Sequence, residues 1–436
     1  MTQTILSIFT LCLFLTQTLA SEDVIKSVRY LKPEASFSEV SDLYLKDGII
    51  TRIIPSKHND QVRYVIPSFC DAYITLGVDG AGGQNNLQTI QTSLRSFLYH
   101  GVTHVLSIAD GPWIHKIKSE IDSGKLLGPK ITIASRPLIP KSSEVKDISD
   151  VLYFPVENPT SAFSELERQL TEISRSVHIF NRYTQDANFS FDSGLLNQLR
   201  LEAKDKNKLI TVHTFGDRIS ILDALISGNR YLVHPILYEM ETEITRQHKE
   251  EINLIPILNV YRNSYLNNLE GSEGLTELEM LKKKDKFFLD HYVSLYEGSL
   301  GFELDSKEIE TRQLDYLSYT KFIEKNPILK QKLILGSGAG NRLSFPGVSF
   351  IQELQILGKI LKNDENLFRI PTQNSCSYIG GSYNGVLAVG KEANLIVLKD
   401  NPAKNINTLF EIEQVFQFGK LVRFNSTTTK KIRKKK

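Results

Sequence analysis

Residues 65–80 read VIPSFCDAYITLGVDG. An apolar start, a proline and a polar end that contains glycine predict a short buried strand that stops at a turn. The last positions of the expected strand are Tyr73, Ile74 and Thr75. The role of this strand therefore depends on which residues from other segments lie beside it.

The middle of the chain alternates such strands with helical patterns. In one of these patterns Leu195, Leu196, Leu199 and Ala203 share a helical face. Strand followed by helix, repeated over roughly 300 residues, is typical of a parallel sheet closed into a barrel, so we predict an α/β protein with a (β/α)8 TIM barrel. A barrel has eight strands, so at least one candidate strand is wrong or is an extra element. The candidates cover residues 70–75, 103–108, 130–134, 151–154, 177–180, 209–213, 231–234, 255–258 and 333–336.

Short strands are expected at both ends of the chain. Asp47-Gly48 lies between two alternating apolar runs and predicts a hairpin. Gly390-Lys391 and Gly419-Lys420 occur in similar strand–turn–strand patterns. We therefore predict that both ends together form a small β-sandwich domain. The predicted boundaries are 21–65 and 376–424 for the sandwich and 66–375 for the barrel, with a charged, mostly helical insertion at about 247–331.

The first residues are typical of a secretory signal peptide. Residues 5–15 (ILSIFTLCLFL) form an apolar run, and Thr18 and Ala20 are small enough for the −3 and −1 positions of a cleavage site. A membrane anchor is disfavoured because about 11 apolar residues are too few to span a bilayer, which needs roughly 20. We predict that residues 1–20 are a signal peptide, that the mature chain is secreted or periplasmic, and that it has no transmembrane segment.

Two cysteines, Cys70 and Cys376, follow the predicted signal peptide. An oxidising compartment permits a disulfide, but two cysteines in a chain of 436 residues are not a disulfide framework. We therefore expect two buried thiols.

The net charge of +2 hides an uneven distribution, because residues 430–436 (KKIRKKK) carry six positive charges. Without these six the chain has a charge of −4, which gives no reason to expect nucleic acid as a partner. We predict that residues 425–436 form a solvated basic tail, and contact with an anionic surface is the alternative.

Several segments resemble motifs of the amidohydrolase superfamily. VIPSFCDAYITL (65–76) is similar to the family's V-x-P-G-F-x-D-x-H-x-H motif, and LILGSGAGN (333–341) is similar to its G-T-D-A-G-N segment. The resemblance covers nearly all of the mature chain, and its closest branch is the imidazolonepropionase and prolidase-like enzymes. It implies a barrel with a small β-sandwich, the layout that the hairpins and the strand–helix alternation predict independently. Further matching segments are HGVTHVLSI (100–108), SGKLLGPKITIASRPL (123–138), LITVHTFG (209–216), SGNRYLVHPI (227–236) and GVLAVGKEANLIVLKDNP (385–402).

The resemblance implies metal-dependent hydrolysis of C–N bonds in amides or cyclic amides, with one or two divalent ions that activate water. The family pattern takes two histidines from strand one, a carboxylated lysine from strand four, one histidine each from strands five and six, and an aspartate from strand eight. Tyr73 and Thr75 occupy the strand-one positions here, and Gly338 replaces the aspartate. These three ligand positions are therefore degenerate.

His213 and His234 remain at the strand-five and strand-six positions, and His178 stands where the family has its lysine. Three histidines and a water make a competent mononuclear zinc site, so we expect one zinc ion or none. The alternative is that these are inherited histidines that bond to backbone carbonyls.

Catalysis also needs a general base, and Gly338 removes the family's base. Tyr73, Asp71 and Asp110 are substitutes by residue type, although the family keeps an aspartate at the Asp71 position beside its own ligands, which favours a structural role there.

Three functions stay open. The first is an amidohydrolase-like pseudoenzyme, catalytically impaired, that binds a small-molecule ligand or a partner. The second is an active mononuclear zinc hydrolase that uses His178, His213 and His234. The third is a structural subunit that pairs with an active relative, and a homo-oligomer is also compatible with the sequence.

Overall fold

The structure is a computed structural model. It describes residues 22–57, 61–78, 84–134, 136–141, 153–171, 175–181, 189–266, 305–341, 343–362 and 365–424. The predicted signal peptide, the predicted basic tail and residues 267–304 of the predicted insertion lie outside the described residues. Within the described ranges, no helix combines the length and the hydropathy that crossing a membrane requires.

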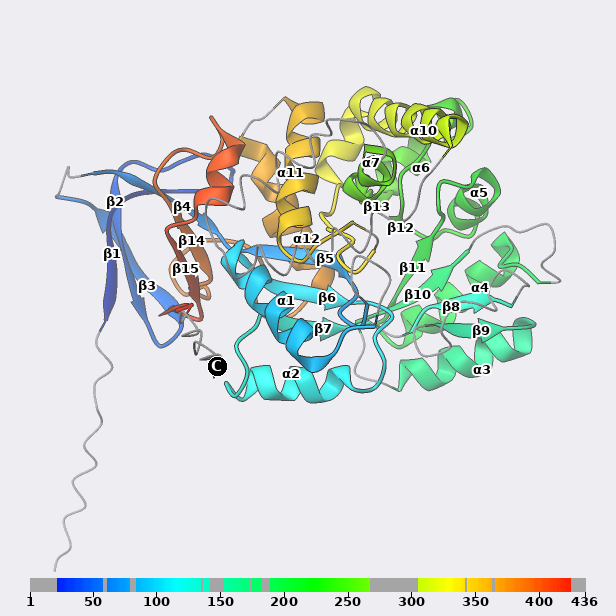
Figure 1. Cartoon of the computed structure of the whole chain (residues 1–436), viewed down its shortest axis with the longest axis horizontal. Helices are drawn as coiled ribbons and strands as arrows, with labels where there is room; N and C mark the ends of the chain where they lie inside the picture. Colours follow the sequence, from blue (N-terminus) through cyan, green and yellow to red (C-terminus); the bar gives the residue numbers. More distant parts are fainter. Residues whose placement is uncertain are drawn as a thin grey trace, which may run out of the picture.

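Both ends of the chain build one seven-stranded sheet, which lies beside the parallel strands (Figure 1). The strand order is β16-β15-β14-β4-β1-β2-β3. Strand β4 joins the two ends, because it pairs parallel with β1 and antiparallel with β14. The strands are β1 (Asp23–Tyr30), β2 (Ser41–Lys46), β3 (Ile49–Pro55), β4 (Arg63–Pro67), β14 (Leu395–Leu398), β15 (Gln414–Gln417) and β16 (Lys420–Leu421).

The predicted β-sandwich is a single sheet that curls back on itself. Beyond the paired strands, Ile50 N donates to Lys391 O (2.9 Å) and Gly390 N donates to Ile50 O (2.8 Å), so β3 meets the segment that precedes β14. The predicted hairpin at Asp47-Gly48 is confirmed, since both residues have positive φ between β2 and β3. The second confirmed hairpin turns at Phe418-Gly419, one residue earlier than predicted.

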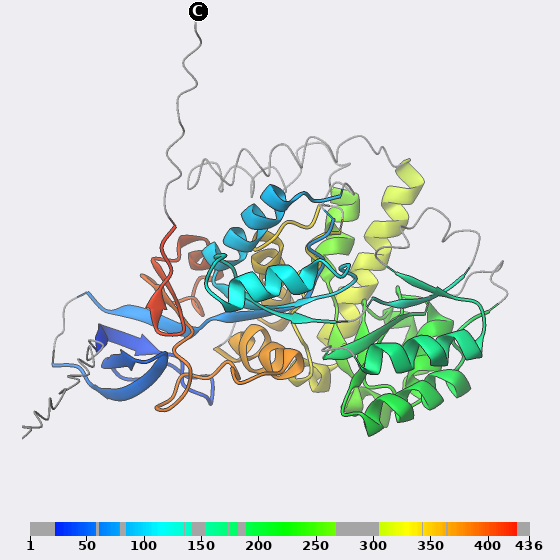
Figure 2. The ribbon, with the colours of Figure 1, turned by 90° about the horizontal axis from the view of Figure 1, so that it is seen from below.

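The middle of the chain forms two parallel sheets. A three-stranded sheet has the order β5-β6-β7, and a six-stranded sheet has the order β13-β12-β11-β10-β8-β9. Figure 2 shows these strands next to the sheet from the two ends, with the long helix α10 (yellow) alongside. The strands are β5 (Phe69–Ile74), β6 (Val102–Ser107), β7 (Lys130–Ile133), β8 (Leu138–Pro140), β9 (Phe154–Val156), β10 (Ser176–Phe180), β11 (Leu209–His213), β12 (Tyr231–Val233) and β13 (Asn253–Ile255).

The predicted closed barrel is not confirmed, because the described residues leave the two sheets joined only by bridges. The candidate strand 333–336 makes isolated contacts on both sides: Leu333 bridges β13, and Leu335 O accepts from Ala72 N of β5 (2.9 Å). The pairing with β5 is interrupted at Ser337, whose N–H donates to the Asp71 carboxylate (2.8 Å). It resumes beyond this residue, since Gly338 N donates to Tyr73 O (3.0 Å) and Thr75 N donates to Ala339 O (2.8 Å). The candidate 255–258 is also wrong, since β13 ends at Ile255 and a helix begins at Leu258.

Helices follow most of the parallel strands and cover their outer side (Figure 1). The face predicted for residues 195–203 is confirmed, since Leu195, Leu196, Leu199 and Ala203 of α4 are buried. The helices are α1 (Leu87–Tyr99), α2 (Ile114–Asp122), α3 (Pro159–Leu170), α4 (Ser193–Asp205), α5 (Arg218–Ile226), α6 (Arg246–Glu251), α7 (Leu258–Leu266), α10 (Ser306–Lys325), α11 (Val348–Leu361) and α12 (Ser375–Ile379), with short turns at Tyr238–Met240, Pro327–Gln331, Glu365–Arg369, Ile370–Asn374 and Ile406–Glu411.

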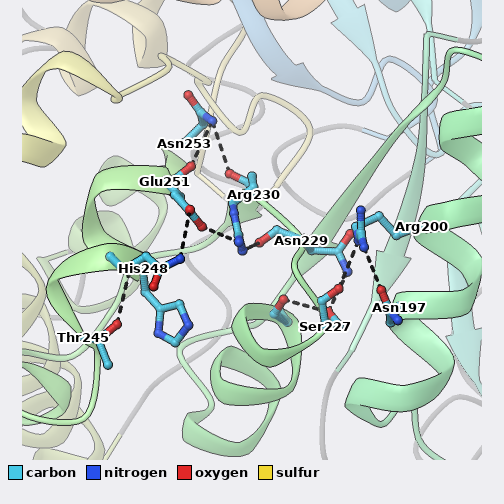
Figure 3. Close-up of polar contacts among 11 residues, drawn as sticks. Asn197, Arg200, Ser227, Asn229, Arg230, Thr245, His248, Glu251 and Asn253 are labelled. Atoms are coloured by element: carbon cyan, nitrogen blue, oxygen red, sulfur yellow. Dashed lines mark hydrogen bonds and ion pairs between the residues drawn. The ribbon is translucent and has the colours of Figure 1, made fainter.

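Polar contacts fasten the connections that lead into β12 and β13 (Figure 3). The Arg200 guanidinium donates to Ser227 O (3.0 Å) at the end of α5, where backbone carbonyls lack helical partners. Asn229 Nδ2 donates to the Ser227 hydroxyl (2.8 Å), and Arg230 forms an ion pair with Glu251. These contacts hold the start of β12 in place. Because β12 has only three residues, they also position its carboxyl end, which His234 follows.

A disulfide joins Cys70 of β5 to Cys376 of α12, so the expectation of two free thiols is wrong. Both cysteines are buried, as expected. Their Cα atoms are 5.1 Å apart because α12 packs against β5, which is within the range that a disulfide requires. The bond links positions separated by 306 residues and anchors the strand that carries Asp71 and Tyr73.

We predict that replacing both cysteines by alanine lowers the free energy of unfolding by about 2–5 kcal/mol, because the cross-link restricts the unfolded chain. Guanidinium unfolding of the purified protein measures the loss. The control is peptide mapping of unfolded, non-reduced protein, which should recover the Cys70 and Cys376 peptides as one linked species. Alkylation of both thiols without reduction would contradict the disulfide.

Candidate functional site

The carboxyl ends of the parallel strands turn sharply. Ala109, Phe215, His234 and Ile257 have φ between +43° and +79°, and each lies within two residues of the end of β6, β11, β12 or β13. This left-handed conformation costs a non-glycine residue about 1–2 kcal/mol. Such strain gathers at sites whose geometry the surrounding structure holds in place, so this edge is the candidate site.

The three histidines that the sequence singled out come together at this edge. His178 lies in β10, His213 ends β11 and His234 follows β12. His178 Nδ1 is 2.8 Å from His213 Nε2, and the ring centroids of His213 and His234 are 5.5 Å apart. All three side chains are buried.

The cluster is electrically neutral. Burial lowers the pKa of His178 and of His234 to about 3. Burial and the two neighbouring histidines hold the pKa of His213 well below its usual range. Each imidazole therefore carries one ring hydrogen at physiological pH.

Neutral imidazoles allow two patterns in the His178–His213 contact. If His213 Nε2 donates to His178 Nδ1, then His178 Nε2 donates to the Ser176 hydroxyl, 2.9 Å away, and His213 Nδ1 keeps a free lone pair. If His178 Nδ1 donates instead, His213 Nδ1 carries the hydrogen. In either pattern both ring nitrogens of His178 take part in hydrogen bonds with Ser176 and His213.

Tyr73 and Thr75 are integrated into the structure around the cluster. The Tyr73 ring is buried with its centroid 5.4 Å from that of His213, and its hydroxyl bonds to Asn341. Burial raises the pKa of Tyr73, so the phenol stays protonated. The Thr75 hydroxyl donates to Ile108 O (2.9 Å). These side chains fill or bridge the positions where the family has histidines.

Gly338 occupies a position that has no room for an aspartate. Its φ is +65°, and a Cβ atom built on it would lie 2.5 Å from Val260 Cγ2 of α7. Two neighbours of Val260 also contact the site: Asn259 Nδ2 donates to Ser337 O (2.8 Å), and the Tyr261 hydroxyl is 2.9 Å from His234 Nδ1. Helix α7 therefore covers the place where the family's aspartate would project.

The two candidate aspartates are engaged with backbone. Asp71 Oδ1 accepts from Ser337 N (2.8 Å) and Tyr73 N (3.2 Å), and burial raises the pKa of Asp71 to about 7. Asp110 accepts from Leu76 N, Gly77 N and the Ser107 hydroxyl, and burial raises its pKa to about 6. Both carboxyl groups hold the segments around β5 in place.

The donor set does not fit the metal centre that the family resemblance implies. Structural and catalytic zinc sites need three or four histidine, cysteine or carboxylate ligands around one point. The described residues contain no group of three or more such side chains that could hold an ion. Two buried nitrogens, His213 Nδ1 and His234 Nε2, have no hydrogen-bond partner among the described residues, and they are the only part of the cluster that points to a ligand.

Sequence reasoning missed the aromatic and acidic residues that complete the site. Phe180 packs on His213 with a centroid distance of 4.2 Å, and Phe215 stacks on His234 at 4.3 Å. Phe215 lies two positions after His213, so its place in the sequence could have identified it as a neighbour of the cluster. No feature of the sequence identifies Glu353 of α11 in this way. Its carboxyl group accepts hydrogen bonds from Leu258 N (2.9 Å) and Asn259 N (2.7 Å) at the start of α7, at least 94 residues away.

We predict that Gly338→Asp lowers the free energy of unfolding by about 2–4 kcal/mol, because it adds a clash with Val260 to the backbone strain. Gly124→Asp is the matched control, since its φ is +72° and no atom lies within 4 Å of its would-be Cβ. Guanidinium unfolding should show a clearly smaller loss for the control. Equal losses would mean that α7 moves aside freely.

Glu353 gives a pH-dependent prediction. Burial raises its pKa to about 7 in the folded state, above the ordinary 4.5, so its contribution to stability is present at low pH and is lost as the pH rises to 7. The stability difference between the native protein and Glu353→Gln should therefore shrink from pH 5 to pH 8 by up to about 3 kcal/mol. Urea unfolding at both values measures it, and a constant difference would contradict the buried acid.

Comparison of the sequence with protein-family models and with curated proteins finds no match. Solved structures do match. A prolidase complexed with N-methylphosphonate-L-proline is 17% identical, with 92% of this chain and 100% of that chain covered and a TM-score of 0.69. The ochratoxinase of A. niger is 16% identical (92% and 95% covered, TM-score 0.66), and a molinate hydrolase is 14% identical (93% and 96% covered, TM-score 0.66). The resemblance to amidohydrolases is thus confirmed at the level of the fold: over nearly its whole length, this chain folds as these hydrolases do.

Proposed function

We propose that this protein is a member of the amidohydrolase superfamily that has lost metal-dependent hydrolysis of C–N bonds and acts by binding a ligand or a partner. The observation that carries the proposal is the contact of α7 with Gly338. Where the family has an aspartate, this chain has a residue without a side chain, and the Cγ2 atom of Val260 lies 2.5 Å from the would-be Cβ.

The described candidates for the general base of hydrolysis are engaged in the structure around them. The carboxyl oxygens of Asp71 and Asp110 mostly accept hydrogen bonds from backbone N–H groups. Tyr73 is a buried phenol whose pKa is raised. A general base must reach the water that it activates. Among the described candidates, Asp71 Oδ2 alone has no partner, and it is buried.

An active one-metal hydrolase is the second candidate. It is favoured by the buried nitrogens His213 Nδ1 and His234 Nε2, which have no partner in the described part of the chain. Unpaired buried polar atoms cost about 1–3 kcal/mol, so an external group that pairs with them would be stabilising. This candidate further requires His178 to leave Ser176 or His213, and zinc is its proposed ion.

We also propose that the chain works outside the cytoplasm. The signal-like residues 1–20 support this, and the buried Cys70–Cys376 disulfide suits an oxidising compartment.

The proposed function predicts well under one zinc per chain after dialysis against zinc, and no turnover of Xaa-Pro dipeptides, molinate or cyclic amides above the rate without protein. Elemental analysis and product chromatography measure both. Turnover with one bound zinc, abolished in His213→Ala and His178→Ala but kept in the exposed control His115→Ala, would establish the one-metal hydrolase instead.

A further inference from the structure

A basic hollow lies between the end of α2 and the β15–β16 hairpin. Its volume is about 840 Å³. The loop after α2 (123–128) and Lys130 form one wall, and residues 417–423 form the other. Gln417 Nε2 donates to Thr103 O and Gly128 O (both 3.3 Å), so the hairpin is held against the parallel strands and the hollow has a defined shape.

The walls carry an excess of positive charge. Lys118, Lys130, Lys420 and Arg423 line the hollow, and Asp122 is the only carboxylate among its lining residues. Asp122 is already paired with Lys118 at 2.5 Å. The other three cations have no carboxylate to neutralise them within the lining.

Apolar side chains stand among these cations. Leu127, Phe418 and Leu421 are 39%, 37% and 39% exposed, and all three line the hollow. The Lys130 ammonium lies 5.7 Å from the centre of the Phe418 ring. A cation beside an exposed aromatic or aliphatic group is the side-chain combination that suits the boundary between lipid headgroups and acyl chains.

The sequence continues from the wall of the hollow into a basic segment. Residues 425–436 follow directly on the wall of the hollow, and six of the last seven are lysine or arginine. Because these residues repeat the charge of the walls, the chain's own C-terminal segment is disfavoured as the occupant of the hollow.

We propose that this face docks onto an anionic phospholipid surface. Stable attachment of a folded protein to a membrane surface takes two signals, and here they are the exposed apolar trio Leu127, Phe418 and Leu421 and the cations around it. Nucleic acid or an acidic polysaccharide would need the cations alone. The apolar trio therefore favours lipid.

Docking in this way leaves the candidate site free. Lys130 begins β7, and Thr103 and Gly128 lie at the same end, so the hollow is at the amino ends of the parallel strands. His213 and His234 lie at the carboxyl ends. Membrane docking at the amino ends therefore leaves the edge that carries the buried histidine cluster facing away from the lipid, whether or not that cluster binds metal.

Flotation of the mature full-length chain with vesicles tests the proposal. We expect at least tenfold stronger binding to phosphatidylglycerol/phosphatidylcholine (30:70) vesicles than to pure phosphatidylcholine, and a loss of most of this binding in 0.5 M NaCl. Lys420→Glu with Arg423→Glu should reduce binding about tenfold or more, and Leu421→Ser with Leu127→Ser severalfold.

The controls lie on α10, on the opposite side of the molecule from α2 (Figure 1). Lys307→Glu with Arg312→Glu matches the charge change, and Leu314→Ser matches an apolar change at a side chain that is 60% exposed. Both should bind as the native chain does, and circular dichroism should show that all variants are folded. Equal binding to both vesicle types, or unchanged binding in the hollow variants, would overturn the proposal. So would charge-dependent binding that the apolar variants do not affect, because that result would mean that the cations alone attract the protein to any anionic surface.

Discussion

A buried carboxyl group, that of Glu353, determines how the carboxyl ends of the strands are covered. Glu353 of α11 accepts hydrogen bonds from the first two N–H groups of α7, Leu258 N and Asn259 N, which have no partner within their own helix. The helix is thereby held with its first turn against the strand ends. Three consecutive residues of that turn then act on the site: Asn259 bonds to Ser337 O, Val260 closes the space at Gly338, and Tyr261 bonds to His234. The site is shaped by this one helix cap as much as by the strands.

At the positions where the resembling family has metal ligands, this chain differs in more than the side chains themselves. If only the side chain at a ligand position differed, the space for a histidine or an aspartate would still be there. Here the Tyr73 ring packs on His213, Thr75 bonds to Ile108 O, and Val260 lies where a Cβ at position 338 would be. Because protein interiors are close-packed, each of these neighbours opposes the introduction of a histidine or an aspartate at these positions.

Features that depend on neighbouring residues could be predicted from the sequence. Strand–helix alternation predicted the parallel strands, and Asp47-Gly48 predicted its hairpin, because both depend on neighbouring residues. The histidines at 178, 213 and 234 were found by resemblance, and they do meet. The sequence could not show that Ser337 N would bond to the Asp71 side chain and interrupt the last ladder, since the two are 266 residues apart. The Cys70–Cys376 bond and the Glu353 cap were missed for the same reason: each depends on packing between distant segments that no local pattern encodes.

The strands of a metal hydrolase are held together at their carboxyl ends by the ion, whose binding free energy contributes to folding. In this chain other contacts join the same strands. The Asp71 carboxylate ties β5 to the segment that begins at Leu333, the His178–His213 hydrogen bond ties β10 to β11, and Tyr261 ties α7 to His234. The disulfide secures β5 from its other end. Contacts of this kind join the strand ends through protein groups alone, which is what the proposed loss of metal-dependent hydrolysis requires of the architecture.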